Sequence, residues 1–224
     1  MTRYPKTPNI FKRDETTHKL MPHQWREPEF EYLKNNQWHF TEKLDGTNMR
    51  LIYNPESIRT KHEDCPSGFS LWGRSDGATV HGNLKTWAEQ WSAEMMHVAV
   101  EVFHGVHPVC IYGEGVGAGI QKGGDQYGAT HFRAFAIKVG DWWLQQPDVD
   151  DICRSLHLRQ VPHIMTGTLM DGVAMVKKGL RTMIGSEPGT HFAEGLIGVP
   201  DCQLLNPSGE RIICKITHKD IFNG

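Results

Sequence analysis

The strongest constraint on the fold is a series of short β-prone runs that begins near Gln37 and continues almost to the last residue. Each run is bounded by Gly, Asp, Asn or Pro, residue types that favour turns and loops. The runs read WHFTEKL, NMRLIY, FSLWGR, PVCIYGEG, HFRAFAIKV, AEGLIGVP and RIICKIT. This pattern predicts antiparallel β-sheets.

Three helices are predicted between these strands. Apolar residues repeat at three- and four-residue spacing from Leu84 to Val98, behind Asn83, which is a favourable N-cap. A second helix is predicted from Pro147 to about Leu158, and a third between Thr168 and Leu180. Strands and helices together indicate an α+β fold.

The length and composition favour one domain. The chain has 224 residues, of which 38% are hydrophobic and 22% charged, enough to bury one sizeable core. Residues 1–36 are rich in Pro and charge and are predicted to form a loop-dominated lead-in packed on the domain. Residues 37–224 are predicted to form a single domain, without an appended oligonucleotide-binding domain after the last strand.

Charge and cysteine content exclude several classes of protein. A formal net charge of -2 argues against a generally basic surface, so contacts with phosphate must come from a local cluster of Lys and Arg. Five widely spaced cysteines without a Cys-x-x-Cys pair argue against a disulfide framework and a zinc site. No segment is long and apolar enough to span a membrane, so a cytoplasmic protein with no membrane partner is expected.

The segment TEKLDGTNMR carries the clearest chemical signal. It places Lys43 at the end of an alternating strand, followed by Asp45-Gly46, a strong turn signal, and a second strand. A lysine amine becomes a nucleophile when nearby cations or desolvation lower its pKa, and Arg50 and Lys215 are candidates for those cations. Taken alone, Lys-x-Asp-Gly is short enough to arise by chance, and an exposed hairpin with a surface lysine is the alternative.

Further segments follow this motif in a characteristic order: WGRSDGATVHG, IYGEGVGAGIQKG, FRAFAI, AEGLIGVP and ICKITHKD. From about Phe40 to Ile221, this order resembles the successive motifs of the RNA ligase branch of the covalent nucleotidyltransferase superfamily. The resemblance implies an adenylation domain of two antiparallel β-sheets with flanking helices around a nucleotide cleft.

The resemblance also implies roles for individual residues. Lys43 would be the nucleophile that forms a lysyl-AMP phosphoramidate, and Glu194 would lie at the metal-bound end of the site. Lys215 and Arg74 would neutralise charge on the transferred phosphate. The other residues predicted to bind nucleotide are Glu42 near the adenine edge, Asp45 in the turn, Asn48 and Arg50 near the phosphates or bound ends, Glu114 at the ribose, Phe135 stacked on the purine, and Lys219.

Two segments depart from the family pattern. Phe135-Ala136-Ile137 stands where the family commonly has Phe-Asp-Ile, and Lys215-Ile216-Thr217 stands where it has Lys-x-Lys. Lys219 would share a face with Thr217, and so replace the second lysine, only if the strand continues that far.

The implied function is ATP-dependent RNA ligation with Mg²⁺ or Mn²⁺. Lys43 would take AMP from ATP, the AMP would pass to a 5′-phosphate end, and a 3′-hydroxyl would displace it. RNA ends or a nicked duplex are the expected partners, and small ligases of this kind are often phage-encoded. Two alternatives stay open: a DNA ligase or nick-sealing enzyme acting with a partner, and a nucleotide- or nucleic-acid-binding relative that has lost turnover.

Overall fold

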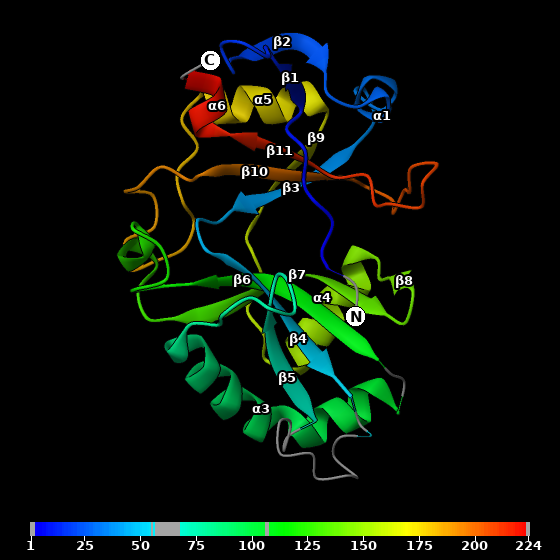
Figure 1. Cartoon of the computed structure of the whole chain (residues 1–224), viewed down its shortest axis with the longest axis vertical. Helices are drawn as coiled ribbons and strands as arrows, with labels where there is room; N and C mark the ends of the chain where they lie inside the picture. The colour runs from blue at the N-terminus through cyan, green and yellow to red at the C-terminus, as the bar shows by residue number, and fades with distance from the viewer. Residues whose placement is uncertain (1–2, 55, 57–67, 106–107, 223–224) are drawn as a thin grey trace. The chain divides into compact units, whose positions relative to one another are not determined.

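The computed structural model describes residues 3–54, 56, 68–105 and 108–222. The chain divides into unit 1, which comprises Met1–Tyr4 and Asp45–Val161, and unit 2, which comprises Pro5–Leu44 and Pro162–Gly224. Both units combine antiparallel strands with helices (Figure 1), so the predicted α+β class is confirmed.

Unit 1 contains a five-stranded antiparallel sheet with the strand order β5-β4-β6-β7-β8. The strands are β4 (Thr47–Tyr53), β5 (Phe69–Gly73), β6 (Val109–Val116), β7 (His131–Val139) and β8 (Trp142–Trp143). The helices are α3 (Gly82–Phe103), α4 (Gln146–Ser155) and the 3-10 turn η1 (Gly124–Tyr127). Helix α3 packs against β5 and β7, and α4 packs against β7.

Helix α3 is the amphipathic helix that the apolar spacing predicts. Leu84 and Trp91 are buried in the core of unit 1, against the sheet residues Met49 and Leu51. The helix begins earlier than predicted, because the N-cap is His81, whose imidazole accepts a hydrogen bond of 3.3 Å from the Asn83 N–H. Histidine is outside the usual set of N-cap residues, so the composition favoured Asn83 instead.

Unit 2 contains a four-stranded antiparallel sheet with the order β11-β10-β3-β9, and a separate pair formed by β1 and β2. The strands are β1 (Phe11–Arg13), β2 (Leu20–Trp25), β3 (Trp38–Lys43), β9 (His163–Gly167), β10 (Gly195–Pro200) and β11 (Cys214–Thr217). The helices are α1 (Pro28–Tyr32), α5 (Leu169–Lys177) and α6 (His218–Phe222).

Alternation along β3 gives the unit 2 sheet two different faces. Trp38 and Phe40 are fully buried, and Phe40 lies against Gly172 of α5, where an added Cβ would be 2.7 Å from the ring. Thr41 and Lys43 are only partly buried and point to the opposite side of the strand. The sheet therefore carries Lys43 on the face that α5 does not cover.

The first 36 residues are more ordered than the loop-dominated lead-in that the sequence predicts. They contain β1, β2 and α1, and they bury Ile10, Phe11 and Phe30 in the core of unit 2. The segment around Asn9 also pairs with β11, because the Lys215 N–H donates to the Pro8 carbonyl at 2.9 Å and the Ile10 N–H to the Lys215 carbonyl at 3.1 Å. The apolar residues are irregularly spaced, which is why no periodic signal revealed them.

Asp45 and Gly46 do not close a hairpin, which corrects the interpretation of this pair as a turn between paired strands. Strand β3 pairs with β10 and β9, whereas β4 pairs with β5 and β6. A Cβ on Gly46 would lie 2.4 Å from the carbonyl oxygen of Gly115. Glycine is therefore required here for close backbone approach rather than for a left-handed turn.

The thiols of Cys110, Cys153, Cys202 and Cys214 are free, and Cys65 lies outside the described residues. Burial raises the pKa of Cys110 to about 11 and the pKa of Cys153 and of Cys214 to about 12. These three side chains therefore act as packing residues at neutral pH. Among the described residues, no helix has both the length and the apolar character needed to cross a bilayer.

Candidate active site

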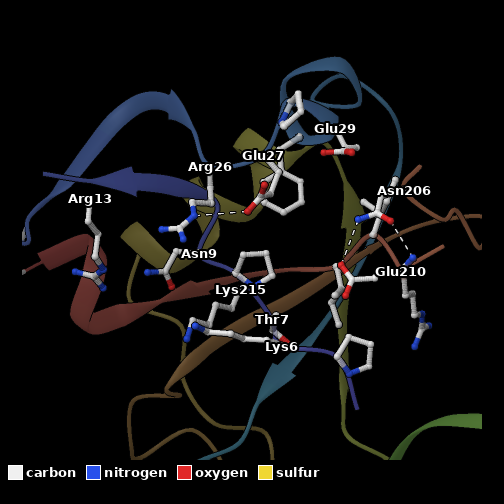
Figure 2. A pocket seen from close by; sticks show the side chains of 17 residues that line it. Lys6, Thr7, Asn9, Arg13, Arg26, Glu27, Glu29, Asn206, Glu210 and Lys215 are labelled. Carbon is white, nitrogen blue, oxygen red and sulfur yellow. Dashed lines mark hydrogen bonds and ion pairs between the residues drawn. The ribbon is translucent and has the colours of Figure 1, made fainter. Parts of the chain in front are cut away.

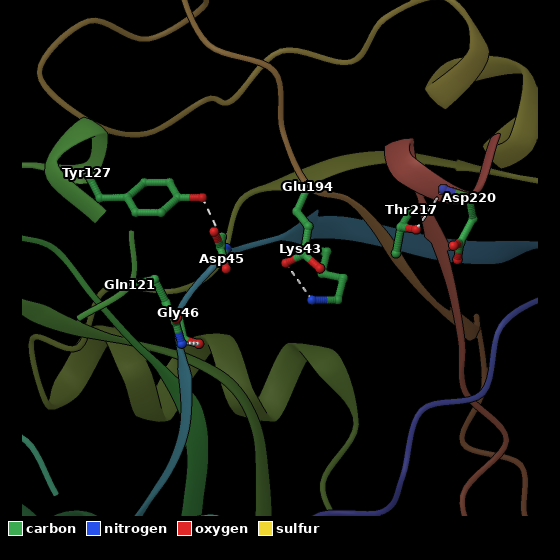
Figure 3. A network of polar contacts seen from close by, with 8 residues as sticks. All are labelled: Lys43, Asp45, Gly46, Gln121, Tyr127, Glu194, Thr217 and Asp220. Carbon is green, nitrogen blue, oxygen red and sulfur yellow. Dashed lines mark hydrogen bonds and ion pairs between the residues drawn. The ribbon is translucent and has the colours of Figure 1, made fainter. Parts of the chain in front are cut away.

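Lys43, at the end of β3, forms an ion pair with Glu194. The lysine Nζ donates to Glu194 Oε2 at 2.6 Å, as Figure 3 shows, and the two side chains are 24% and 34% exposed. Glu194 immediately precedes β10, in which Gly195 lies directly opposite Lys43. Strand pairing thus brings together two of the predicted site residues and leaves both accessible to a ligand.

Gly195 allows the backbone that follows Glu194 to enter the sheet close against β11. Its φ is +154°, and a Cβ on it would lie 2.1 Å from the carbonyl oxygen of Ile216 and 2.7 Å from the Cα of Thr217. Both obstacles are backbone atoms of β11, which cannot rotate away. The close approach of β10 to β11 at this position requires glycine.

Lys215 lies on the same face of the sheet as Lys43. In the register of the sheet, Ile197 is opposite both Thr41 and Lys215, and Thr41 is two residues from Lys43 on β3. Burial lowers the pKa of Lys215, and the ammonium group of Lys43 lowers it further, whereas the carboxylates of Asp220 and Glu194 act in the opposite direction. The arrangement favours binding of an anion next to the two lysines.

We expect Lys215→Met to raise the stability of the folded protein. A lysine whose pKa is lowered in the folded state makes its ammonium form unfavourable there, and this cost is fully present below the folded pKa. The variant should therefore have a higher Tm at pH 7, and the gain should shrink as the pH rises toward the ordinary lysine pKa. If the protein takes AMP from ATP, as the sequence resemblance implies, that transfer should fall by about 100-fold, measured with labelled ATP; an unchanged rate would contradict a role of Lys215 beside the phosphates.

Glu42 points to the opposite face from Lys43 and is only 1% exposed. One carboxylate oxygen accepts from the Thr182 hydroxyl at 2.5 Å, and the other accepts from the Met183 N–H at 2.8 Å. Glu42 therefore holds the segment around residue 182 against β3. Its predicted contact with the adenine edge stays a prediction, and Thr182 and Met183 had no recognisable sequence signal.

Where β11 ends determines which residues after Lys215 lie in the same strand. The strand stops at Thr217, and helix α6 begins at His218, so the condition that would have placed Lys219 on the face of Thr217 is not met. Lys219 is exposed on α6. Thr217 is 8% exposed, and its hydroxyl accepts from the Asp220 N–H at 3.2 Å (Figure 3). Thr217, two residues after Lys215, is therefore the residue of this motif that remains in the strand.

In unit 1, Asp45 and Gly46 are bonded to the glycine-rich segment that follows β6. The Asp45 N–H donates to the Tyr127 hydroxyl at 3.0 Å, and the Gln121 amide donates to the Gly46 carbonyl at 3.0 Å (Figure 3). Gln121 and Tyr127 were not predicted as site residues, although both lie in or next to a segment that carries the family resemblance. Two motifs far apart in sequence are therefore joined within this unit.

Asn48 and Glu114 face each other across β4 and β6. Asn48 precedes the buried core residue Met49, so its side chain points away from the core side of the sheet. Its Oδ1 is buried and has no hydrogen-bond partner among the described residues. Because an unsatisfied buried acceptor costs roughly 1–3 kcal/mol, a ligand hydroxyl or amino group would be stabilised there.

The two predicted arginines of unit 1 have different environments. The side chain of Arg50 is 1% exposed; its Nε donates to the Gly73 carbonyl at 2.9 Å and its Nη2 to Asp76 Oδ1 at 2.7 Å. Hydrogen bonding and charge from Arg50 also lower the pKa of Asp76. Arg50 therefore secures the turn after β5, whereas Arg74 lies in that turn with an exposed side chain.

Phe135 is partly buried on β7 and contacts Tyr4. The two ring centroids are 4.9 Å apart at an interplanar angle of 68°, and Tyr4 also contacts Tyr112 at 5.2 Å. An aromatic side chain of the N-terminal segment thus covers part of Phe135. The predicted stacking of Phe135 on a purine stays a prediction.

Several solved structures share the fold. A variant of the Naegleria gruberi RNA ligase with ATP and Mn matches with a TM-score of 0.65 and 15% identity, over 100% of this chain and 57% of that chain. The same ligase with PPi matches with a TM-score of 0.62 and 15% identity, over 100% of this chain and 62% of that chain. This chain therefore spans roughly three fifths of the length of these ligases.

Sequence comparisons give a more specific result. A search of curated proteins found no match. The family model described as RNA ligase matches residues 36–207, which include β3 with Lys43, the glycine-rich segment after β6, and Glu194. The match covers most of the chain, and the motifs inside it are those joined by the contacts described above. The chain therefore belongs to the RNA ligase family.

Proposed function

We propose that this chain joins RNA ends in an ATP-dependent reaction in which Lys43 becomes covalently linked to AMP. The observation that carries the proposal is the position of the Lys43 Nζ, 2.6 Å from Glu194 and on the same sheet face as the partly desolvated Lys215. Membership of the RNA ligase family supports the same chemistry.

In the first step, the Lys43 amine loses a proton and attacks the α-phosphorus of ATP. A phosphorus–nitrogen bond forms, the bond to the bridging oxygen breaks, and pyrophosphate leaves with the electron pair. Glu194 Oε2 is close enough to accept the proton, and Lys215 supplies positive charge for the phosphate oxygens. In the second and third steps, a 5′-phosphate takes the AMP and a 3′-hydroxyl then displaces it.

Glu194 is the proposed protein ligand for Mg²⁺ or Mn²⁺. Among the described residues, no cluster of three or more His, Cys, Asp or Glu side chains is arranged to hold a metal ion. Magnesium commonly uses one or two carboxylates together with substrate phosphates and water, so a single acidic residue fits such an ion. The bound metal would neutralise charge on the phosphates. The Naegleria gruberi RNA ligase solved with ATP and Mn supports the use of a divalent metal ion together with ATP.

The nucleoside is proposed to use residues of unit 1. Asn48 Oδ1 is a buried acceptor without a partner among the described residues, and Glu114 offers carboxylate oxygens opposite it. These acceptors suit ribose hydroxyls or an amino group. Phe135 is proposed to contact the base and Arg74 the phosphates, as the family resemblance implies.

Incubation of the protein with ATP labelled on the α-phosphate tests the proposal. We expect one labelled adduct per chain, located on Lys43 by mass spectrometry of proteolytic peptides, and joining of 5′-phosphorylated RNA. RNA, DNA and hybrid duplexes with nicks, together with single-stranded RNA, should be compared in the same assay. A folded protein without an adduct would instead indicate a binding relative that has lost turnover, and an adduct on another lysine would refute the assignment of Lys43.

A further inference from the structure

Unit 2 contains a pocket of about 540 Å³ between the segment that precedes β1, the start of α1 and the segment that leads into β11 (Figure 2). Cationic side chains predominate among its charged lining residues. They are Lys6, Arg13, Arg26, Arg211 and Lys215. The chain carries a net charge of -2, so the pocket is the kind of local basic cluster that contact with phosphate requires.

Some of these cations already have partners and some do not. Arg13 is paired with Asp220, and Arg26 approaches Glu27 at 3.6 Å in a half-exposed pair. Within the part of the chain that the structure describes, Lys6 and Lys215 form no ion pair. The two lysines are therefore available to an anionic ligand.

The side of the pocket that carries Lys6 and Lys215 is formed by two chain segments joined by backbone hydrogen bonds. The Lys215 N–H and carbonyl are bonded to Pro8 and Ile10, so the chain that bears Lys6 is tied to the edge of β11. Lys215 lines the pocket and also belongs to the sheet face of Lys43. The pocket therefore shares Lys215 with the proposed reaction site, and much of its lining comes from residues 5–30, which lie before the region matched by the family model.

We propose that this pocket binds a nucleotide of the RNA strand, with the phosphate held by Lys6, which forms no ion pair among the described residues, and by Arg26, whose long, half-exposed pair with Glu27 a phosphate can replace. The volume suits a ligand of nucleotide size. The lining also includes Glu27, Glu29 and Glu210, which would repel the dense charge of pyrophosphate but can accept hydrogen bonds from ribose hydroxyls. The 2′-hydroxyl distinguishes RNA from DNA, so the carboxylates would favour RNA. The choice of RNA as the polymer rests on the proposed function.

The test compares two double charge reversals in a Lys43→Ala background, which binds without reacting. One variant carries Lys6→Glu and Arg26→Glu; the control carries Lys12→Glu and Lys19→Glu, two exposed positions that do not line the pocket. Both change the net charge equally, so long-range repulsion is matched. The affinity for a 5′-phosphorylated single-stranded RNA is measured by fluorescence anisotropy at several salt concentrations.

We expect the pocket variant to bind RNA at least about 10-fold more weakly than the control. The slope of the logarithm of the binding constant against the logarithm of the salt concentration should become less steep by about 0.7 for each lost phosphate contact. The loss should be larger for RNA than for DNA of the same sequence. Equal affinities in pocket and control variants, with equal Tm values, would overturn the proposal. An equal loss for RNA and DNA would overturn the role of the carboxylates.

A second arm restores Lys43 and measures formation of the AMP adduct. We expect the same rate in the pocket variant as in the control. Slower adduct formation with unchanged RNA affinity would overturn the proposal, because the pocket would then serve the phosphates of ATP. If the protein forms no adduct but the pocket variant still binds RNA more weakly than the control, the result would support the pocket and refute only the proposed ligase chemistry.

Discussion

Replacing Lys43 with alanine is expected to lower ATP-dependent joining of 5′-phosphorylated RNA by at least about 10⁴-fold, because the proposed nucleophile of the first step is lost. The fold should persist, since the side chain is partly exposed and its ion pair with Glu194 contributes little to stability. Labelled ATP and gel-resolved RNA products measure both effects.

RNA that already carries AMP on its 5′ end provides the control for this variant. Its joining needs only the third step, in which the 3′-hydroxyl attacks and Lys43 forms no bond. The Lys43→Ala protein should therefore join this substrate with a loss of less than about 100-fold. Joining of both substrates at the wild-type rate would contradict the assigned role of Lys43.

Gly195→Val is expected to lower the free energy of unfolding by about 3–5 kcal/mol, the largest effect on stability that we predict. The new Cβ would meet the Ile216 carbonyl oxygen at 2.1 Å, at a φ of +154°. For a chain of this size, the loss corresponds to a fall in Tm of about 6–20 °C. Thermal unfolding followed by circular dichroism measures it.

Gly77→Ala is the matched control for that substitution. No atom lies within 4 Å of a Cβ built on Gly77, and its φ is not positive. We expect its Tm to stay within about 2 °C of the wild-type value. A Tm of the Gly195→Val protein equal to that of the control would show that β10 can move away from β11 at little cost.

Local sequence patterns predicted most of the regular structure. Every run that was read as a strand contains one, and each of the three expected helices exists. The apolar stripe that begins at Leu84 and the alternation through Trp38 and Phe40 are strong signals, because burial on one face imposes the spacing. Strands β1 and β2 were missed because Phe11, Leu20 and their neighbours follow no regular period.

Pairing partners could not be predicted in the same way. The Asp45-Gly46 pair indicates a hairpin by its local chemistry, yet β3 finds its partner in β10, which lies far along the chain. The same long-range pairing brings Glu194 to Lys43, a contact that the family resemblance suggested but no local pattern could show. Whether Lys219 shares the face of Thr217 could not be predicted, because nothing in the sequence marks the end of β11 at Thr217.

The order of the strands along the chain has a consequence for synthesis. The main segment of unit 1, Asp45–Val161, is continuous, whereas β3 must wait for β9, β10 and β11 to emerge from the ribosome. Until then its apolar residues Trp38 and Phe40 lack the neighbours supplied by later segments such as α5, and both strand edges can pair with other nascent chains. The segment that bears Lys43 is thus open to mispairing for longer than the strands of unit 1 during translation.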